Sequence, residues 1–248
     1  MGDVYIVNGA KKWVTNGIFA DYCTAAVRTG KAGRDGISAL VIALKASGVA
    51  VRAMQNSGVS ASGSTYIEFD DVEVPVVNLL GRENPGFEII MSKFNHERLW
   101  LACTSLRMAR CCVEDAYAYA NNRETFGHKL ISNQTIQAKF SAMGRAIEPA
   151  HAYMEQLLGM MMHNGPAAND PYLGGLVASL KVQAGRTLGF VVREAQQVLG
   201  GVGYSRTGKG ARVEQISRVM VVGGGSEEVL ESLAIKQEMK AVRETGRL

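Results

Sequence analysis

The spacing of apolar residues changes once along this chain, near residue 85, and this change restricts the possible fold more than any other feature. Before it, short apolar runs are separated by glycine and polar residues, a pattern typical of strands and turns. After it, apolar residues recur with helical spacing as far as the last expected helix. A sheet followed by helices indicates an α+β chain.

The expected elements follow from these two patterns. We expect strands at residues 4–7, 11–15, 23–28, 36–44, 49–54 and 65–69. Asn8-Gly9 stands between the first two, and an Asn-Gly pair between such runs is a strong hairpin signal. Helices are expected from about residue 85 to Asn121-Asn122, over 133–162 with a kink at Pro149, from Asn169-Asp170-Pro171 to Gly200-Gly201, and after Ser226 as N-cap.

These elements predict two domains. Residues 1–82 are expected to be a partial β-domain, an antiparallel sheet or barrel, and residues 83–248 an antiparallel four-helix bundle. Because the chain opens almost at once in a strand, we expect that an N-terminal region covering this sheet is missing. With 248 residues, of which 47% are hydrophobic, the chain is long enough to form a core.

Composition and charge argue against several classes of function. The net charge is +4, but lysine and arginine are spread along the chain, which does not favour nucleic-acid binding and still suits an anionic small ligand. The four cysteines and four histidines have no metal-ligand spacing, so no metal site is predicted. There is no run of about 18 apolar residues and no signal-peptide layout. We expect no membrane span and a cytoplasmic or organelle-matrix location, mitochondrial or peroxisomal in a eukaryote, with no targeting signal visible.

Glu97-Arg98 interrupts the apolar stripe of the first expected helix. The stripe includes Phe94 before this pair and Leu101 after it. Neighbouring residues do not face each other on a helix, so the two charges cannot simply neutralise one another. A buried carboxylate without a partner would have a raised pKa, which suits a general base. Alternatively, both side chains reach the flank of the helix and meet solvent or other ions.

Three glycines, Gly223-Gly224-Gly225, precede the last expected helix. A phosphate site at that helix N-terminus is disfavoured, because Glu227 and Glu228 already occupy its positive end. The glycines are expected instead to let the backbone approach something flat and neutral.

Several motifs together carry a family resemblance. They are NGAKKWVTNG at residues 8–17, FDDVEVP at 69–75, RETFG at 123–127, Gln134, and QVLGGVGY at 197–204. With these motifs the chain resembles the acyl-CoA dehydrogenases, flavoproteins with an N-terminal helical domain, a middle β-domain and a C-terminal four-helix bundle. The resemblance extends from the second part of the β-domain to the end of the chain.

The resemblance implies FAD binding and α,β-dehydrogenation of an acyl-CoA thioester, because protein side chains cannot accept a hydride. In the family pattern, the tryptophan matching Trp13 packs beside the flavin, and the hydroxyl matching Thr15 hydrogen-bonds near its N5 edge. Without the resemblance, Trp13 is interpreted as an inward-facing strand residue. Arg123 is similar to the arginine that pairs with the FAD pyrophosphate, a contact suited to a bidentate guanidinium.

The resemblance also implies an oligomer. The rest of that FAD contact is matched by Phe126, Gln134, Gln197, Gly200 and Gly201. In the family this group serves the flavin of a neighbouring subunit, which implies a homo-oligomer, a dimer or a tetramer. Gly224 and Gly225 match flavin-side positions, although the family threonine is replaced by Gly225. The implied electron acceptor is electron-transfer flavoprotein or a similar protein.

The catalytic base distinguishes branches of the family. Most members carry a glutamate in a Tyr-Glu-Gly-Thr motif, and glycine stands at that position here, Gly223. A branch that includes the long-chain and isovaleryl-CoA dehydrogenases takes its base from the bundle helix, in a segment that Glu97-Arg98-Leu99 resembles. The resemblance thus implies that Glu97 removes the α-proton while the β-hydride passes to flavin N5. It also implies that the Gly223 N–H donates to the thioester oxygen, with Asn95 and Arg98 on the substrate side.

Two alternatives to an active dehydrogenase remain open. The first is a catalytically impaired, truncated remnant that binds FAD weakly or serves as an assembly piece. It is suggested by the absent N-terminal helical domain and by a connection between Arg218 and Gly223 that is shorter than in the family. The second is an oxidase-like flavoenzyme, reacting with oxygen or acting on nitroalkanes. A nitroalkane enzyme is expected to use an aspartate near the glycine segment, where none stands.

Overall fold

The computed structural model describes residues 3–163, 171–205 and 217–246. The chain forms two compact units, Met1–Lys93 and Phe94–Leu248, which we call unit 1 and unit 2. The first helix, α1 (Gly86–Asn122), begins in unit 1 and continues into unit 2. The domain boundary predicted after residue 82 stays a prediction.

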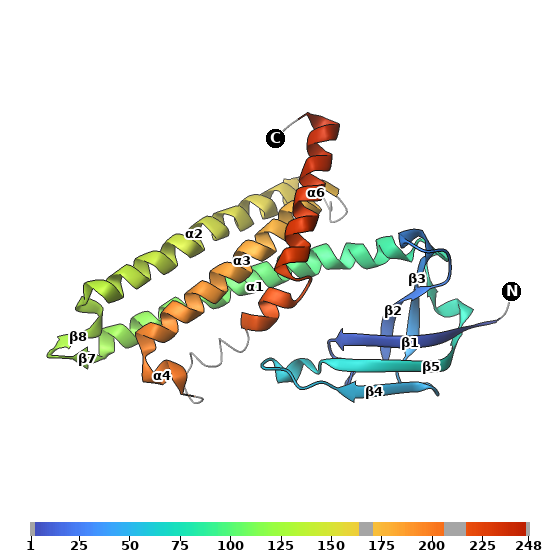
Figure 1. Cartoon of the computed structure of the whole chain (residues 1–248), viewed down its shortest axis with the longest axis horizontal. Helices are drawn as coiled ribbons and strands as arrows, with labels where there is room; N and C mark the ends of the chain where they lie inside the picture. Colours follow the sequence, from blue (N-terminus) through green and yellow to red (C-terminus); the bar gives the residue numbers. More distant parts are fainter. Residues whose placement is uncertain (1–2, 164–170, 206–216, 247–248) are drawn as a thin grey trace. The chain divides into compact units, whose positions relative to one another are not determined.

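Unit 1 contains two small antiparallel sheets, whose strands run across one another in Figure 1. The first has the order β1 (Val4–Val14), β5 (Thr65–Pro75), β4 (Val49–Ala53). The second has the order β2 (Tyr22–Arg28), β3 (Ile37–Ala43), β6 (Leu79–Leu80). Short 3-10 helices span Arg34–Gly36, Ser60–Ser62 and Val76–Asn78. Buried side chains of β3 and β5, such as Leu40, Ile42 and Ile67, form the core, as alternation along strands requires.

The hairpin predicted at Asn8-Gly9 is wrong. Strand β1 runs straight through this pair, and its register against β5 shifts between Val7 and Gly9, which is a β-bulge. Asn8 Nδ2 donates to Asp71 Oδ1 at 2.8 Å, and the Asp71 N–H donates back to Asn8 Oδ1 at 2.8 Å. Gly9 has φ 132°, so the permissive backbone of glycine serves the bulge and not a turn.

Unit 2 is a helical bundle. It consists of α1, α2 (Gln134–His163), α3 (Pro171–Leu199) and α6 (Glu227–Thr245), with a short α4 (Gly201–Tyr204) and a helical segment at 217–222. The hairpin of β7 (Glu124–Thr125) and β8 (His128–Lys129), followed by a 3-10 helix over Leu130–Ser132, joins α1 to α2. The predicted α+β fold, antiparallel sheets followed by a helical domain, is confirmed.

The predicted helix limits agree closely with the structure. Helix α1 ends at Asn122, α3 ends just before Gly200, and Ser226 is the N-cap of α6. Pro149 lies inside α2. The predicted start of the third helix at Asn169-Asp170 falls outside the described residues. No described helix has the length and apolar character needed to cross a membrane.

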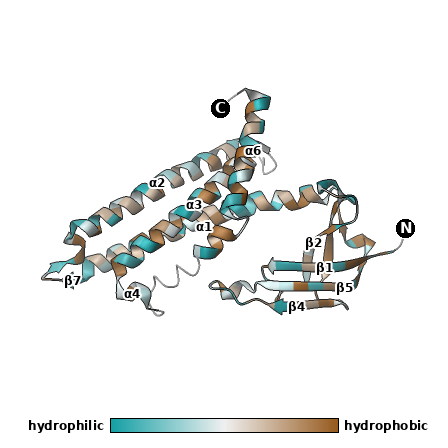
Figure 2. Ribbon diagram, viewed as in Figure 1, coloured by the Kyte–Doolittle hydropathy of each residue, from teal (hydrophilic) through white to brown (hydrophobic). Residues whose placement is uncertain are grey.

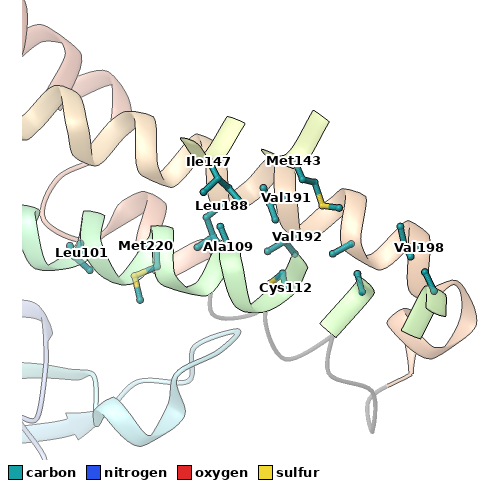
Figure 3. Packing of buried hydrophobic residues seen from close by; sticks show 13 residues of the cluster. Leu101, Ala109, Cys112, Met143, Ile147, Leu188, Val191, Val192, Val198 and Met220 are labelled. Carbon is teal, nitrogen blue, oxygen red and sulfur yellow. The ribbon is translucent and has the colours of Figure 1, made fainter. Parts of the chain in front are cut away.

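A hydrophobic cluster joins α1, α2 and α3 (Figure 3). Its members include Ala109 and Cys112 of α1, Met143 of α2, and Leu188 and Val192 of α3. Hydrophobic and hydrophilic residues alternate along these helices, as amphipathic packing requires (Figure 2). Burying each large side chain contributes about 1.5–3 kcal/mol to the free energy of unfolding. This cluster therefore stabilises the helices of unit 2 that carry the candidate site residues.

Candidate functional site

Glu97 and Arg98 lie in opposite environments. Arg98 is 9% exposed, whereas Glu97 lies on the exposed side of α1. Adjacent residues point about 100° apart around a helix, which allows this separation. Burial lowers the pKa of the Arg98 guanidinium, and the nearby Glu97 charge opposes that shift. Neither interpretation of the sequence holds for the pair: the carboxylate reaches the surface, and the cation is the buried member.

Arg98 connects α1 to the three glycines at residues 223–225, which we call the glycine turn. Its Nε donates to the Gly224 carbonyl oxygen at 2.9 Å, and an Nη donates to Asn95 Oδ1 at 3.2 Å. Its guanidinium carbon lies 5.5 Å from the centre of the Phe94 ring, a cation–π contact. The structure thus brings the predicted substrate-side residues Asn95 and Arg98 to the predicted glycine segment.

The glycine turn has a backbone that side chains disfavour. Gly224 has φ 66° and Gly225 has φ 119°. A Cβ on Gly224 would lie 3.0 Å from Leu101 Cδ1, and one on Gly225 would lie 2.9 Å from Leu230 Cδ2. The positive φ values favour glycine at both positions, and any larger residue would also have to displace the Leu101 side chain of α1 or the Leu230 side chain of α6.

Lys181 of α3 holds the other side of the turn, and the sequence analysis missed it. Its Nζ donates to the carbonyl oxygens of Val221 at 2.6 Å and Gly225 at 2.8 Å. The side chain is 2% exposed, and burial lowers its pKa to about 8. The available signal was a lone lysine in the apolar run at residues 176–182, on a helix face that should have been apolar.

The backbone donors of the turn differ from the prediction. The Gly223 N–H, expected to face a thioester oxygen, donates to the Val219 carbonyl oxygen at 2.8 Å. The helical segment at 217–222 runs directly into Gly223, so this N–H completes the helical pattern. Within the described residues, the N–H groups of Gly224 and Gly225 donate to no acceptor. They are the donors available to a ligand.

The residues predicted to contact a neighbouring subunit's FAD gather at one end of unit 2, which we call the hairpin end. It comprises Arg123, Phe126, Gln134, Gln197, Gly200 and Gly201 at the end of α1, the β7–β8 hairpin, the start of α2 and the end of α3. All six are exposed, Phe126 completely. No described residue forms an ion pair or a side-chain hydrogen bond with Arg123. An exposed guanidinium of this kind is free to bind an anion.

The hairpin end is far from the glycine turn. Arg98 lies on α1 and Arg123 directly follows Asn122, the last residue of this helix, so the helical rise of ~1.5 Å per residue places the two arginines about 37 Å apart. The glycine turn and the hairpin end are therefore two separate groups of candidate residues.

Trp13 and Thr15 lie in unit 1. Trp13 is 66% exposed and Thr15 is also exposed, so the interpretation of Trp13 as an inward-facing residue is wrong. Trp13 has φ 65°, and Lys12 Nζ lies 4.8 Å from its ring centre. A bulky residue in the left-handed region is uncommon and strained, and such residues concentrate at binding sites.

Comparison with known proteins identifies the family. The model of the acyl-CoA dehydrogenase middle domain matches residues 1–72, and that of the acyl-CoA dehydrogenase C-terminal domain matches residues 84–239. The chain belongs to the acyl-CoA dehydrogenase family. An acyl-CoA dehydrogenase of Alternaria alternata is 50% identical and one of Emericella nidulans 41% identical, each alignment covering 96% of this chain and 56% of the relative. The chain thus spans little more than half the length of these relatives.

Solved structures agree with the assignment to the acyl-CoA dehydrogenases. A probable acyl-CoA dehydrogenase from Mycobacterium abscessus is 35% identical with a TM-score of 0.90, over 96% of this chain and 62% of that one. Butyryl-CoA dehydrogenase from Megasphaera elsdenii is 28% identical with a TM-score of 0.86, over 95% and 61%. These dehydrogenases depend on FAD, and one feature of this chain fits such a group. Arg123 is exposed, and its side chain has no ion pair or hydrogen bond within the part of the chain that the structure describes.

Proposed function

We propose that this chain is the β-domain and helical bundle of an FAD-dependent acyl-CoA dehydrogenase that removes hydrogen from the α and β carbons of a thioester. The observation that carries the proposal is the arrangement around the glycine turn. The turn has no carboxylate of its own, two of its N–H groups donate to no acceptor among the described residues, and Arg98 links it to the helix that presents Glu97.

In the proposed reaction, Glu97 accepts the α-proton on a carboxylate oxygen. The N–H groups of Gly224 and Gly225 stabilise the negative charge that develops on the thioester oxygen, a task that needs no side chain. This assigns to Gly224 and Gly225 the donor role first expected of Gly223, whose missing side chain leaves space beside the turn. Asn95 and Arg98 position the turn relative to α1. FAD, when bound, supplies the acceptor for the β-hydride.

The proposed FAD site is divided between subunits. Trp13 and Thr15 would contact the flavin, and the hairpin end would bind the pyrophosphate through Arg123. Because about 37 Å separate Arg98, which binds the glycine turn, from Arg123 at the hairpin end, we assign the two groups of residues to two different FAD molecules. The proposal therefore includes a homo-oligomer, a dimer or tetramer, with electron-transfer flavoprotein or a similar protein as electron acceptor.

One experiment tests the proposed function directly. The full chain is purified, its flavin absorbance is recorded, and acyl-CoAs from C4 to C16 are added without oxygen. A yellow protein whose flavin band bleaches with one range of chain lengths supports the proposal. A protein that takes up no FAD, or that binds FAD without bleaching, contradicts it and favours the truncated remnant. Hydrogen peroxide formed in air without another acceptor would instead identify the oxidase-like alternative.

A further inference from the structure

Lys181 is a deeply buried cation with no acidic hydrogen-bond partner among the described residues. A buried ammonium group is costly unless it is well hydrogen-bonded. Its two acceptors are backbone carbonyls on either side of the glycine turn, Val221 before it and Gly225 at its end. The charges that act on its pKa are those of Glu227 in α6 and Glu97 in α1, which favour the ammonium form, and that of Arg98, which disfavours it.

The planarity of the peptide bond links these carbonyls to the free donors. In a trans peptide, the carbonyl of one residue and the N–H of the next point in opposite directions. Arg98 binds the Gly224 carbonyl, which directs the Gly225 N–H away from Arg98. Lys181 donates to the carbonyl oxygens of Val221 and Gly225. The backbone between these two residues, which includes Gly223 and Gly224, is therefore fixed at its start and at its end.

This arrangement leads to an inference that rests on the proposed function. We propose that Lys181 is a positioning residue, which holds the glycine turn so that the N–H groups of Gly224 and Gly225 stay directed at the thioester oxygen. Lys181 touches no reacting atom; it acts through the backbone of the turn. A misplacement of about 1 Å at such donors is enough to lower a rate by about 100-fold.

The wild-type chain permits a test that needs no activity. Gly63-Ser64 and Gly225-Ser226 are the Gly-Ser steps of the sequence. When glycine carbonyl carbons are labelled with carbon-13 and serine nitrogens with nitrogen-15, a labelled carbonyl is bonded to a labelled nitrogen only at these two steps. The carbon–nitrogen coupling therefore splits the carbonyl signals of Gly63 and Gly225 and no others. The Gly225 carbonyl is expected to shift with a midpoint near pH 8, following Lys181, whereas Gly63, which accepts from Thr65, stays constant. A Gly225 signal that stays constant up to about pH 11.5, above the ordinary pKa of a lysine, overturns the inference.

A second test measures catalysis in three variants. Lys181→Met removes the donors, Lys181→Arg keeps a cation, and Lys139→Met removes the lysine that pairs with Glu194 of α3 away from the turn. We expect Lys181→Met to lower kcat by about 10-fold to 100-fold with little change in KM, because the turn acts mainly in the transition state. Lys181→Arg is expected to recover part of kcat. Lys139→Met, which controls for loss of stability at α3, is expected to keep it.

The outcomes separate the two proposals. If the wild type does not reduce its flavin with any acyl-CoA, the proposed function fails, and the carbonyl titration alone shows whether Lys181 holds the turn. If the wild type is active and Lys181→Met keeps its kcat, the positioning role is overturned. If Lys181→Met does not fold, the wild-type titration decides: a Gly225 signal that follows the titration of Lys181 supports the inference, and a constant signal contradicts it.

Discussion

The glycine turn and the hairpin end differ in how much of their geometry the chain itself supplies. The turn is held by Arg98 from α1 and by Lys181 from α3, both buried, and its left-handed glycines fit closely against neighbouring side chains. At the hairpin end the predicted ligand contacts are exposed, and a Cβ at Gly200 would meet nothing within 4 Å. The fixed N–H donors of the glycine turn are suited to stabilising charge in a transition state. The exposed groups of the hairpin end are suited to a binding surface that forms only when a cofactor and a second subunit are added.

The largest expected effect concerns Glu97, the proposed catalytic base. Glu97→Gln is expected to lower turnover by about 100-fold to 10,000-fold while FAD binding persists, because it removes the proton acceptor and keeps the shape of the side chain. Turnover and flavin absorbance measure the two properties separately. Glu114→Gln, an exposed glutamate on the same helix that pairs with Arg107, is the matched control and should retain activity. Wild-type turnover in Glu97→Gln would remove Glu97 from the mechanism.

The parts that the sequence predicted correctly are those that local pattern determines. The helical spacing of apolar residues and the Ser226 cap located the helices of the bundle closely. The hairpin predicted at Asn8-Gly9 was wrong because the conformation of this pair depends on Asp71, which is distant in the sequence. Asp71 of β5 forms hydrogen bonds with Asn8 of β1. Local turn propensity cannot include such a partner.

The candidate site shows the same limit. Glu97 and the glycine segment were found from motifs, but the buried role of Lys181 depends on carbonyls 40 and 44 residues away. The availability of the Gly223 N–H depended on whether the preceding helix continues up to the turn, which a resemblance to longer relatives did not reveal. Backbone groups carry no sequence signal of their own, so contacts made by them are the least predictable part of a site.

The second prediction concerns the buried charge at the turn. The pKa of Lys181 is lowered to about 8 in the folded chain, below the ordinary value of 10.5, so between these values the unfolded chain binds more protons. The free energy of unfolding should therefore rise with pH across this window, by up to about 3 kcal/mol from this group. Urea unfolding at about pH 7.5 and pH 10 measures the change, and Lys181→Met should lack this contribution. An equal pH dependence in both proteins would show that the Lys181 ammonium is not strained by burial.

The third prediction compares glycines from the two regions. Gly224 and Gly200 both have left-handed φ values, 66° and 57°, but only at Gly224 would a Cβ meet other side chains, those of Leu101 and Arg98. Gly200, with φ 57° and ψ −132°, lies in a backbone region that residues with a Cβ avoid, so Gly200→Ala is expected to cost about 1–3 kcal/mol of unfolding free energy from the backbone alone. Gly224→Ala should lose a further ~1–2 kcal/mol through overpacking against Leu101 and Arg98. Equal costs in urea unfolding would mean that Leu101 and Arg98 move aside, and that the turn is less tightly held than its contacts indicate.

The smallest expected effect separates binding from stability at the hairpin end. Arg123→Met removes an exposed guanidinium that has no ion pair among the described residues, so the free energy of unfolding should change by less than about 0.5 kcal/mol. The affinity for FAD should fall by about 10-fold to 100-fold, because a charge-assisted contact with the pyrophosphate contributes about 1.5–3 kcal/mol. FAD titration of the full chain measures this loss. Arg107→Met, which removes an exposed arginine of α1 away from the hairpin end, should leave FAD affinity unchanged. If both variants bind FAD as the wild type does, the hairpin end is not a cofactor surface, and its exposed residues need another explanation.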